Sequence, residues 1–547
     1  MPEPAVGPSD GPHVQTETER KFALLPGAVV PDLSALAAVG EPHVDHLDAT
    51  YFDSPTYDLV RSRAVLRRRS GGEDEAWHLK LPKDSGTPTG AGAGTPSRTE
   101  VHVPLGATPD PLLVPTELRA LVTDRVGPVP LVPIARLETV RTVRVLSDPT
   151  SGSPLAELAD DTVTATRAAL PGIEGRTVTW RELEVELRDA GTADFLDAVT
   201  ERLQWAGIVP AASPSKLAHA LGDAPQEAAE RTVSPDTALL QVVMTALGVH
   251  IGVLQSRQED VRVDGPDAVH KTRVASRRLR SILRVFRSLF DTDSVGTMRE
   301  ELKWYAERLG HARDAEVQKQ KLTAQLAALP AEAVVGPVGR RMEAELEATH
   351  QEALGRVREC LASDRYRDLM VALSRFLTDP PLAADAPRDG AAPDDEDDES
   401  VLEESTADLA PALVHRAIRR VRKAYARAEA SEGQERLESL HEVRKKAKVV
   451  RYACEALVPA YGEPAADAAR AWAAVTEVFG EMNDAVVART RLAGIAEAAA
   501  LDGEPTFTYG VLYGTQMGSL ERDMPAARAA LKRAIRRGPE TWDTDDE

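Results

Sequence analysis

Alternation of polar and apolar residues is the dominant pattern in the first half of the chain. In the stretch 177–187, glutamates at positions 182, 184 and 186 alternate with Leu183, Val185 and Leu187. Side chains at i and i+2 of a β-strand lie on the same face of a sheet. The pattern therefore predicts a strand with one acidic face and one apolar face.

The same criterion predicts further strands. They are expected near 16–22, 43–52, 64–69, 76–81, 98–101, 131–146, 155–165 and 177–187. Short helices are expected at 31–39, 114–121, 193–205 and 215–221, and a flexible Gly/Pro-rich loop at 85–96. Charged residues of both signs recur on one face of these strands. An antiparallel barrel of about eight strands holds such an interior only if water, metal and a polyanion fill it.

The first predicted strand carries Glu17, Glu19 and Lys21, spaced by two. Two neighbouring carboxylates suit a hard divalent cation, and an adjacent ammonium suits an anion. Alone this motif is weak, because charged edge strands are common.

A helical period replaces the alternation after a polar connector at 222–234. Helices are expected at 238–261 and from Pro266 onward. In the second of these, His270, Arg273, Arg277 and Arg280 are spaced by 3, 4 and 3, which places them on one stripe of the helix. The later phrase Leu309-Gly310-x-x-Arg313-Asp314 is expected to end one helix and open the next.

The basic stripe recurs further along the chain. His441, Arg444, Lys448 and Arg451 repeat its spacing, 171 residues later (441 − 270). Phe479-Gly480-x-x-Asn483-Asp484 repeats the glycine phrase at nearly the same offset, 170 residues (484 − 314). Two matched motifs at one offset indicate internal duplication of a helical unit.

Composition limits the classes of function. A length of 547 residues suggests three or four units, at roughly 150 residues each. Only 4% of residues are aromatic, which argues against a stacking platform for nucleic-acid bases, and a net charge of −21 argues against general nucleic-acid or membrane binding. Two distant cysteines, Cys360 and Cys454, fit a reduced, cytoplasmic setting. No run of about 18 apolar residues indicates a membrane span.

These shifts in pattern define the expected domain boundaries. We expect a disordered lead without signal-peptide order at 1–12, a strand-rich domain at 13–222, a linker at 223–233, a helical domain at 234–538 and an acidic tail at 539–547. The helical domain comprises repeats at 234–379 and 409–538 around an acidic insert at 380–408. Such an insert cannot bury apolar surface and is expected to be disordered; metal binding by it is the lesser alternative.

Residues 13–222 resemble the CYTH domain of the triphosphate tunnel metalloenzyme superfamily. The matching motifs are Glu17-x-Glu19-x-Lys21, Tyr51-Phe52-Asp53, Leu66-Arg67-x-Arg69, Leu79-Lys80-x-Pro82, Arg98-x-Glu100, Glu157 with Asp161, Glu182-x-Glu184 and Ser215-Lys216. The resemblance implies an antiparallel β tunnel, Mg²⁺ or Mn²⁺, and a substrate with a triphosphate or a similar phosphate chain.

The resemblance also implies roles for individual residues. The metal ligands would be Glu17, Glu19, Glu182 and Glu184. The acidic floor, or the group that orients the attacking water, would be Glu100, Glu157 and Asp161. The phosphate oxygens would be held by Lys21, Arg67, Arg69, Lys80, Arg98, Arg141 and Lys216.

Some residues of this region keep a second interpretation. Lys216 fits either a tunnel residue or the cap of a surface helix. Arg136 and Arg144 have the opposite strand parity to Arg141 and are weaker candidates. His78 is expected to be a solvated strand residue, because Mg²⁺ prefers oxygen ligands, and Asp53 a turn residue.

The duplicated basic stripe resembles the CHAD domain, an all-α unit that commonly accompanies CYTH domains and is associated with inorganic polyphosphate. The resemblance implies polyphosphate binding by His270, Arg273, Arg277, Arg280, His441, Arg444, Lys448 and Arg451. The alternative is a solvated basic face paired with acidic residues of neighbouring helices.

The expected fold class is multidomain α+β, with an eight-stranded antiparallel β tunnel followed by a duplicated helical bundle. The leading functional hypothesis is metal-dependent hydrolysis of inorganic triphosphate or short polyphosphate, with polyphosphate binding by the helical domain. The alternatives are a non-catalytic polyphosphate-binding or targeting protein, or another triphosphate chemistry: nucleoside or thiamine triphosphate hydrolysis, or adenylate cyclisation. Neither membrane nor nucleic acid is expected as a partner, and the sequence leaves protein partners unknown.

Overall fold

A computed structural model describes residues 18–25, 27–72, 74–82, 98–108, 110–383, 404–517 and 519–542. The chain divides into two compact units, Met1–Arg231 and Thr232–Glu547. The predicted lead at 1–12, the loop at 85–96 and most of the insert at 380–408 lie outside the described residues.

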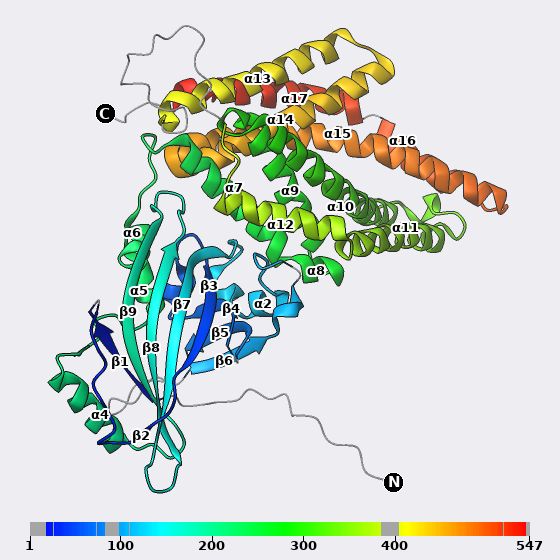
Figure 1. Ribbon diagram of the computed structural model, residues 1–547. Helices are drawn as coiled ribbons and strands as arrows, with labels where there is room; N and C mark the ends of the chain where they lie inside the picture. The colour runs from blue at the N-terminus through cyan, green and yellow to red at the C-terminus, as the bar shows by residue number, and fades with distance from the viewer. Residues whose placement is uncertain are drawn as a thin grey trace, which may run out of the picture. The chain divides into compact units, whose positions relative to one another are not determined.

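The first unit is built on one antiparallel sheet (Figure 1). Its strands are β1 (Glu19–Leu24), β2 (Ala38–Val39), β3 (His43–Asp53), β4 (Val65–Ser70), β5 (Ala76–Pro82), β6 (Arg98–Val103), β7 (Val132–Ser147), β8 (Pro154–Arg167), β9 (Arg176–Leu187) and β10 (Val209–Pro210). Their order is β10-β1-β9-β8-β7-β3-β4-β5-β6, and β2 pairs with β7. The predicted antiparallel sheet is confirmed. It has ten strands rather than eight, because β2 and β10 have two residues each and show no alternation.

Short helices accompany the sheet. They are α1 (Asp58–Arg61), α2 (Thr116–Leu121), α3 (Thr123–Val126), α4 (Ala193–Trp205), α5 (Lys216–Leu221) and α6 (Ala224–Glu230). Leu196, Val199 and Leu203 of α4 pack in one core cluster with Leu183 and Val185 of β9. The apolar face of β9 therefore supports α4, and its acidic face points the other way.

One local prediction in this unit is wrong. The segment 31–39 forms turns and strand β2 instead of a helix, because the backbone of Ala38 and Val39 pairs with β7 while Leu33 and Ala37 are buried in the core. The connector at 222–234 contains helix α6.

The second unit is all-α, as predicted. Its helices are α7 (Leu239–Ser256), α8 (Gln258–Arg262), α9 (Ala268–Val285), α10 (Thr292–Ala327), α11 (Val338–Leu361), α12 (Asp364–Thr378), α13 (Thr406–Ala430), α14 (Gly433–Tyr461), α15 (Glu463–Leu501), α16 (Phe507–Met517) and α17 (Ser519–Arg536). Helix α9 packs against α7 and α10, α14 packs against α13 and α15, and α9 and α14 contact each other. The two basic stripes therefore lie on adjacent helices.

The two glycine motifs, at 309–314 and 479–484, do not separate helices. Gly310 lies inside α10 and Gly480 inside α15, so the predicted helix boundary at 309–314 is wrong. Glycine lowers the helix propensity at these positions by only about 1 kcal/mol, which the packing of such long helices outweighs.

Helix α7 is long and apolar enough to cross a membrane, with a mean hydropathy of 1.5. Half of that 18-residue window is buried inside the unit, and the core helix of a soluble protein has the same length and composition. Cys360 and Cys454 are buried free thiols.

Candidate functional site

Strand register gathers the charged positions of the first unit on one face of the sheet. Lys21 pairs with Glu184, Glu182 with Asp161, and Asp161 with Arg141, across β1, β9, β8 and β7. Paired residues of neighbouring strands point to the same face. The helix α5, which contacts β7 and β8, adds the side chain of Lys216 to this face.

Asp161, Glu182 and Glu184 form a buried acidic triad whose ligand oxygens lie within 4.8 Å of one another. The ammonium of Lys216 contacts all three, at 2.9 Å from Asp161, 2.8 Å from Glu182 and 2.7 Å from Glu184. Arg141 donates to Asp161 at 2.7 Å and to Glu184 at 2.5 Å. The triad is therefore buried together with its counter-charges.

These cations keep Glu184 ionised. Burial alone raises the pKa of Glu184, but Lys216, Lys21 and Arg141 together hold that pKa well below its usual range. Burial lowers the pKa of Lys216, but Glu184, Asp161 and Glu182 raise it well above the ordinary lysine value. The ion pairs therefore stabilise the fold above the usual glutamate pKa. That stability is lost in acid as Glu184 protonates, and in strong base as Lys216 loses its proton.

The donor set of the triad fits Mg²⁺ or Mn²⁺, because hard divalent cations prefer oxygen ligands. Two of the predicted metal ligands, Glu182 and Glu184, belong to it, and the third carboxylate is Asp161, which was predicted as catalytic. Glu19 lies on β1 and contacts Lys21 at 3.1 Å. Glu17 lies outside the described residues.

Arg67 and Arg69 of β4 form the least compensated part of the charged face. Their Nε atoms are buried and lack a hydrogen-bond partner. Within the described chain Arg67 has no ion pair, and the carboxylate nearest Arg69 is Asp74, at 3.7 Å. Burial lowers the pKa of Arg69, and the charges of Arg67 and Arg141 lower it further. This arrangement favours an anion between them.

Lys80 and Glu100 form a second group on β5 and β6. Lys80 Nζ lies 3.2 Å from Glu100 Oε2. Burial raises the pKa of Glu100, but hydrogen bonding to His78 and the charge of Lys80 outweigh it and lower the pKa to about 2. His78 is fully buried, so its expected place as a solvated strand residue is wrong.

The other predicted residues of this unit lie apart from these groups. Glu157 pairs with Arg188 at 2.5 Å. Arg136 pairs with Asp48 on the opposite face, as its parity predicted. The side chain of Arg98 lies outside the described part of the chain.

Three further residues of this unit have structural or supporting positions. Asp53 is fully buried and accepts hydrogen bonds from the backbone N–H groups of Leu59 and Val60. Trp180 was not predicted: its indole N–H donates to Glu182 at 2.6 Å, and its ring stacks on His219. The i, i+2 spacing of Trp180 and Glu182 could have predicted that the two side chains share a face of β9. Ser215 caps α5, so Lys216 is free to reach the triad.

In the second unit, Arg273 and Arg277 of α9 lie close to Arg444 and Lys448 of α14, and the four form a cationic cluster. Burial lowers the pKa of Lys448, and the charges of Arg277, Arg444 and Arg273 lower it further, to about 6. Asp484 only partly opposes this effect. Unlike the acidic triad, this half-buried cluster has an excess of one charge, although Arg273 is ion-paired with Asp314 at 3.3 Å.

The remaining members of the two stripes lie at its edge or outside it. Arg280 lies near Arg299 and the carboxylates of Glu300 and Glu307. Arg451 donates to Glu455 at 2.7 Å.

The two histidines also differ. Nδ1 of His441 lies 2.6 Å from the side-chain oxygen of Asn483, whereas His270 is near Arg313. Burial and neighbouring cations lower the pKa of both histidines.

The repeated glycines make room for two arginines of the cluster. A Cβ atom at Gly310 would lie 3.4 Å from Nε of Arg273, and one at Gly480 would lie 3.0 Å from a terminal nitrogen of Arg444. Both distances are tight for a Cβ contact. The absence of a side chain at each glycine therefore leaves room for a guanidinium beside it.

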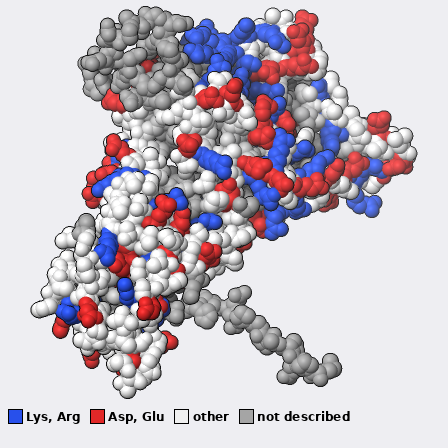
Figure 2. Space-filling view, in the orientation of Figure 1, with Lys and Arg blue, Asp and Glu red and all other residues white. Residues whose placement is uncertain are grey.

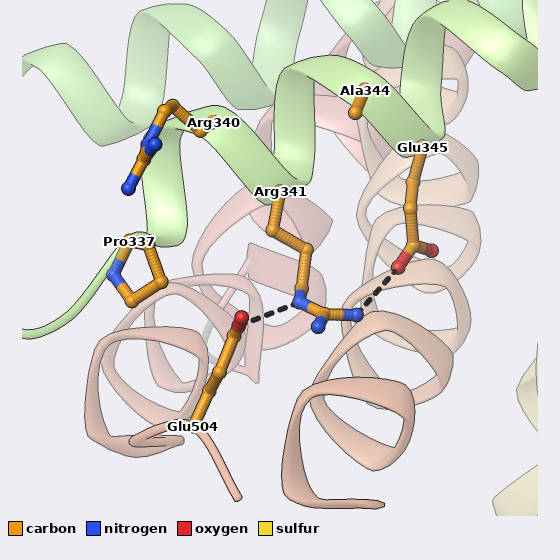
Figure 3. Close-up of a pocket in the computed structure, with 6 residues that line it drawn as sticks. All are labelled: Pro337, Arg340, Arg341, Ala344, Glu345 and Glu504. Carbon is orange, nitrogen blue, oxygen red and sulfur yellow. Dashed lines mark hydrogen bonds and ion pairs between the residues drawn. The ribbon is translucent and has the colours of Figure 1, made fainter. Parts of the chain in front are cut away.

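Charge on the surface is mixed, and a surface hollow lies away from the cluster. Figure 2 shows lysine and arginine gathered over the helical unit, interleaved with aspartate and glutamate. A hollow of about 420 Å³ is lined by Arg340, Arg341, Glu345 and Glu504, among others. In Figure 3, Arg341 points toward Glu345 and Glu504, to which it is ion-paired. Its charge is thus already compensated.

We predict that Lys216→Ala destabilises the protein when divalent metal is chelated, by about 3–5 kcal/mol, because three buried carboxylates lose a shared cation. Mg²⁺ should restore part of this loss, because its charge replaces the ammonium at the same carboxylates. Thermal unfolding with chelator and with Mg²⁺ measures both effects. The control is Arg136→Ala, which removes an exposed ion pair on the opposite face. Equal Mg²⁺ stabilisation of wild type and Lys216→Ala would contradict the prediction.

Comparison with known proteins agrees with this division of the chain. The CYTH domain model matches residues 15–221, and the CHAD domain model matches residues 245–493. Uncharacterized proteins from two strains of Mycobacterium tuberculosis are each 35% identical, over 97% of this chain and 98% of their own length.

Solved structures also match in part. PptA from Streptomyces chartreusis is 20% identical, with a TM-score of 0.41 over 55% of this chain and 100% of that one. The CHAD domain from the plant Ricinus communis is 23% identical, with a TM-score of 0.42 over 55% of this chain and 94% of that one. A putative adenylyl cyclase from Hippeastrum is 18% identical, with a TM-score of 0.23 over 37% of this chain and 94% of that one. On the family models and the full-length relatives, the chain belongs to the family in which a CYTH domain is followed by a CHAD domain.

Proposed function

We propose that the CYTH domain hydrolyses inorganic triphosphate or short polyphosphate with Mg²⁺ or Mn²⁺, and that the CHAD domain binds polyphosphate. The observation that carries the first part is the pairing of two unlike groups on one sheet face. One is an oxygen-only triad suited to a hard cation, and the other is the poorly compensated pair Arg67 and Arg69.

The residues of this face suit a linear phosphate chain. Asp161, Glu182 and Glu184 would hold the metal, which when bound neutralises phosphate oxygens. Arg67 and Arg69 would hold phosphate oxygens in fork geometry. The charges are fixed before substrate arrives, so little reorganisation is needed.

The lysines and Glu100 have supporting roles in this proposal. Lys21 and Lys80 would act as point charges toward the phosphate chain. Lys216 must leave at least part of its contact with the triad when metal binds, and its freed ammonium can then contact phosphate. Glu100, with a pKa of about 2, is too weak a base to accept a proton readily near neutral pH. We therefore assign it to positioning Lys80.

A second candidate is a tunnel that binds phosphate chains without turnover. The contact of Lys216 with all three carboxylates favours it, because the ammonium takes the place that a metal would need. Hydrolysis of other triphosphates remains a third proposal. Phosphate release from tripolyphosphate, long polyphosphate, ATP and thiamine triphosphate, each with and without Mg²⁺ or Mn²⁺, separates the three.

The proposal for the CHAD domain is supported by the cationic cluster. Four half-buried cations, of which Arg273 is ion-paired with Asp314 at 3.3 Å, are costly alone, and a polyanion would offset that cost. Free buried thiols agree with a reducing compartment, and we propose a cytoplasmic location.

We predict that Glu184→Gln abolishes metal-dependent phosphate release from tripolyphosphate while the protein stays folded. The variant removes a charge from the triad, and loss of a metal ligand should cost orders of magnitude in rate. Phosphate release and circular dichroism measure the two effects. Glu138→Gln on the opposite face is the matched control. Near-normal activity of Glu184→Gln at saturating metal would contradict the assignment.

We predict that Arg67→Ala weakens binding of tripolyphosphate more than binding of pyrophosphate. A longer chain reaches more of the basic wall, and each charge-assisted hydrogen bond contributes roughly 1.5–3 kcal/mol. Calorimetric titration of both ligands measures the difference, with Arg136→Ala as control. If both ligands lose the same affinity, Arg67 does not sense chain length.

We predict that long-chain polyphosphate binds the full chain more tightly as the pH falls from roughly 8 to about 6. A bound polyanion favours the charged form of Lys448, whose pKa in the free protein is about 6, so binding takes up a proton. Filter retention across this pH range measures the slope. Lys448→Met should flatten it, and Lys445→Met, at an exposed lysine of the same helix, should not. Equal slopes in wild type and Lys448→Met would rule out this linkage.

A further inference from the structure

A cluster outside the acidic triad combines nitrogen and oxygen donors. His78 of β5, His102 of β6 and Asp74, in the turn before β5, present ligand atoms within 4.8 Å of one another. Nε2 of His78 lies 3.5 Å from Oδ2 of Asp74, and Nδ1 of His102 lies 3.8 Å from Oδ1 of the same carboxylate. Ligand atoms around a tetrahedral zinc ion, with bonds of about 2.0–2.1 Å, lie roughly 3.3 Å apart. Small movements would therefore complete a site.

A second carboxylate faces the other side of both rings. Oε1 of Glu100 lies 3.3 Å from Nδ1 of His78 and 3.4 Å from Nε2 of His102. All four ring nitrogens therefore face carboxylate oxygens. Two neutral imidazoles carry only two N–H donors for these four contacts. With the two N–H groups directed at Glu100, the two nitrogens that face Asp74 keep lone pairs with which to bind a cation; Nε2 of His78 also lies 3.3 Å from the backbone oxygen of Asp74.

The two carboxylates are not equivalent, and this decides where the cation binds. One oxygen of Glu100 is near both rings and can accept an N–H from each, while its other oxygen is held by Lys80. Asp74 offers a separate oxygen to each ring, and its side chain is half exposed. Its other cationic neighbour, Arg69, is 3.7 Å away, beyond hydrogen-bond distance.

We propose that Asp74, His78 and His102 form a binding site for a divalent transition-metal ion such as Zn²⁺, separate from the Mg²⁺ or Mn²⁺ site. Imidazole nitrogen suits Zn²⁺, whereas Mg²⁺ prefers oxygen. Glu100 acts as a positioning residue: it fixes the tautomer and orientation of both rings, as carboxylates do behind metal-bound histidines. Three protein ligands leave one coordination position to solvent.

The test is a titration of untagged, metal-free full chain with Co²⁺, in excess Mg²⁺ that saturates the oxygen-only triad. Visible absorption reports the coordination number, and competition with Zn²⁺ gives the affinity. We expect one equivalent of four-coordinate Co²⁺ that Zn²⁺ displaces. His102→Ala and Asp74→Asn should each weaken binding at least about tenfold, and Glu100→Gln by about 10–100-fold.

The variants are chosen so that unfolding does not mimic the result. His102 and Asp74 are half exposed, whereas His78 is fully buried and is left intact. The matched control is His43→Ala, which removes an exposed histidine that faces a single carboxylate, Asp45; it should bind Co²⁺ as wild type does. Absence of Co²⁺ binding, a six-coordinate spectrum, or unchanged affinity in His102→Ala and Asp74→Asn would overturn the proposal.

Discussion

The CYTH domain depends on keeping buried carboxylates ionised. An isolated charge in a protein interior costs several kcal/mol, and a carboxylate without a partner takes up a proton instead. Here Asp161, Glu182 and Glu184 share Lys216, Arg141 and Lys21, so three negative charges meet three positive ones. Because the pairs span β1, β9, β8, β7 and α5, the same contacts that balance the charge also fix the register of this part of the sheet. These ion pairs therefore link the site to the strands that carry it, beside the apolar core on the other face of β9.

The helical unit has the opposite imbalance, a cluster of positive charges, and its carboxylates compensate these charges only in part. Few carboxylates lie near its cluster of Arg273, Arg277, Arg444 and Lys448. Lys448 is the first of the four to lose its proton, because its pKa falls to about 6. Because arginine resists deprotonation, repulsion between the like charges lowers the pKa of Lys448 instead. A cluster that is balanced within itself, like the triad, must exchange a partner to bind a ligand. An unbalanced cluster gains stability from the ligand directly. This contrast is the physical reason to assign metal exchange to one domain and anion capture to the other.

The sequence alone was sufficient to locate the strands in which polar and apolar residues alternate. The 2-residue alternation located β3, β7, β8 and β9 to within about two residues. The parity of Arg136 against Arg141 correctly separated the two faces. It was not sufficient where tertiary contacts decide: the segment 31–39 is not a helix, because Ala38 and Val39 pair as strand β2 with the end of β7. The glycine motif resembled a helix end, because the sequence does not show that the glycine accommodates a guanidinium from another helix.

The site shows the same limit. The strand faces were readable, but not which charges would meet across strands, so Asp161 was placed with the catalytic residues rather than with Glu182 and Glu184. His78 was expected in solvent because strand alternation places a residue on a face without saying whether that face is covered. Its burial depends on neighbouring strands, with Glu100 and His102 entering from β6.

The two repeats of the helical unit share the contact between glycine and arginine but differ in the residue beside the histidine. The contact of Gly310 with Arg273 has its counterpart in Gly480 with Arg444, so both repeats place a guanidinium beside the glycine. The residue three positions after each glycine has diverged: Arg313 lies near His270, whereas Asn483 bonds to His441. One repeat therefore adds a cation beside its histidine and the other fixes its histidine with a neutral amide. Because Glu316, 2.8 Å from Arg313, offsets the added charge, the two repeats differ mainly in what holds their histidines.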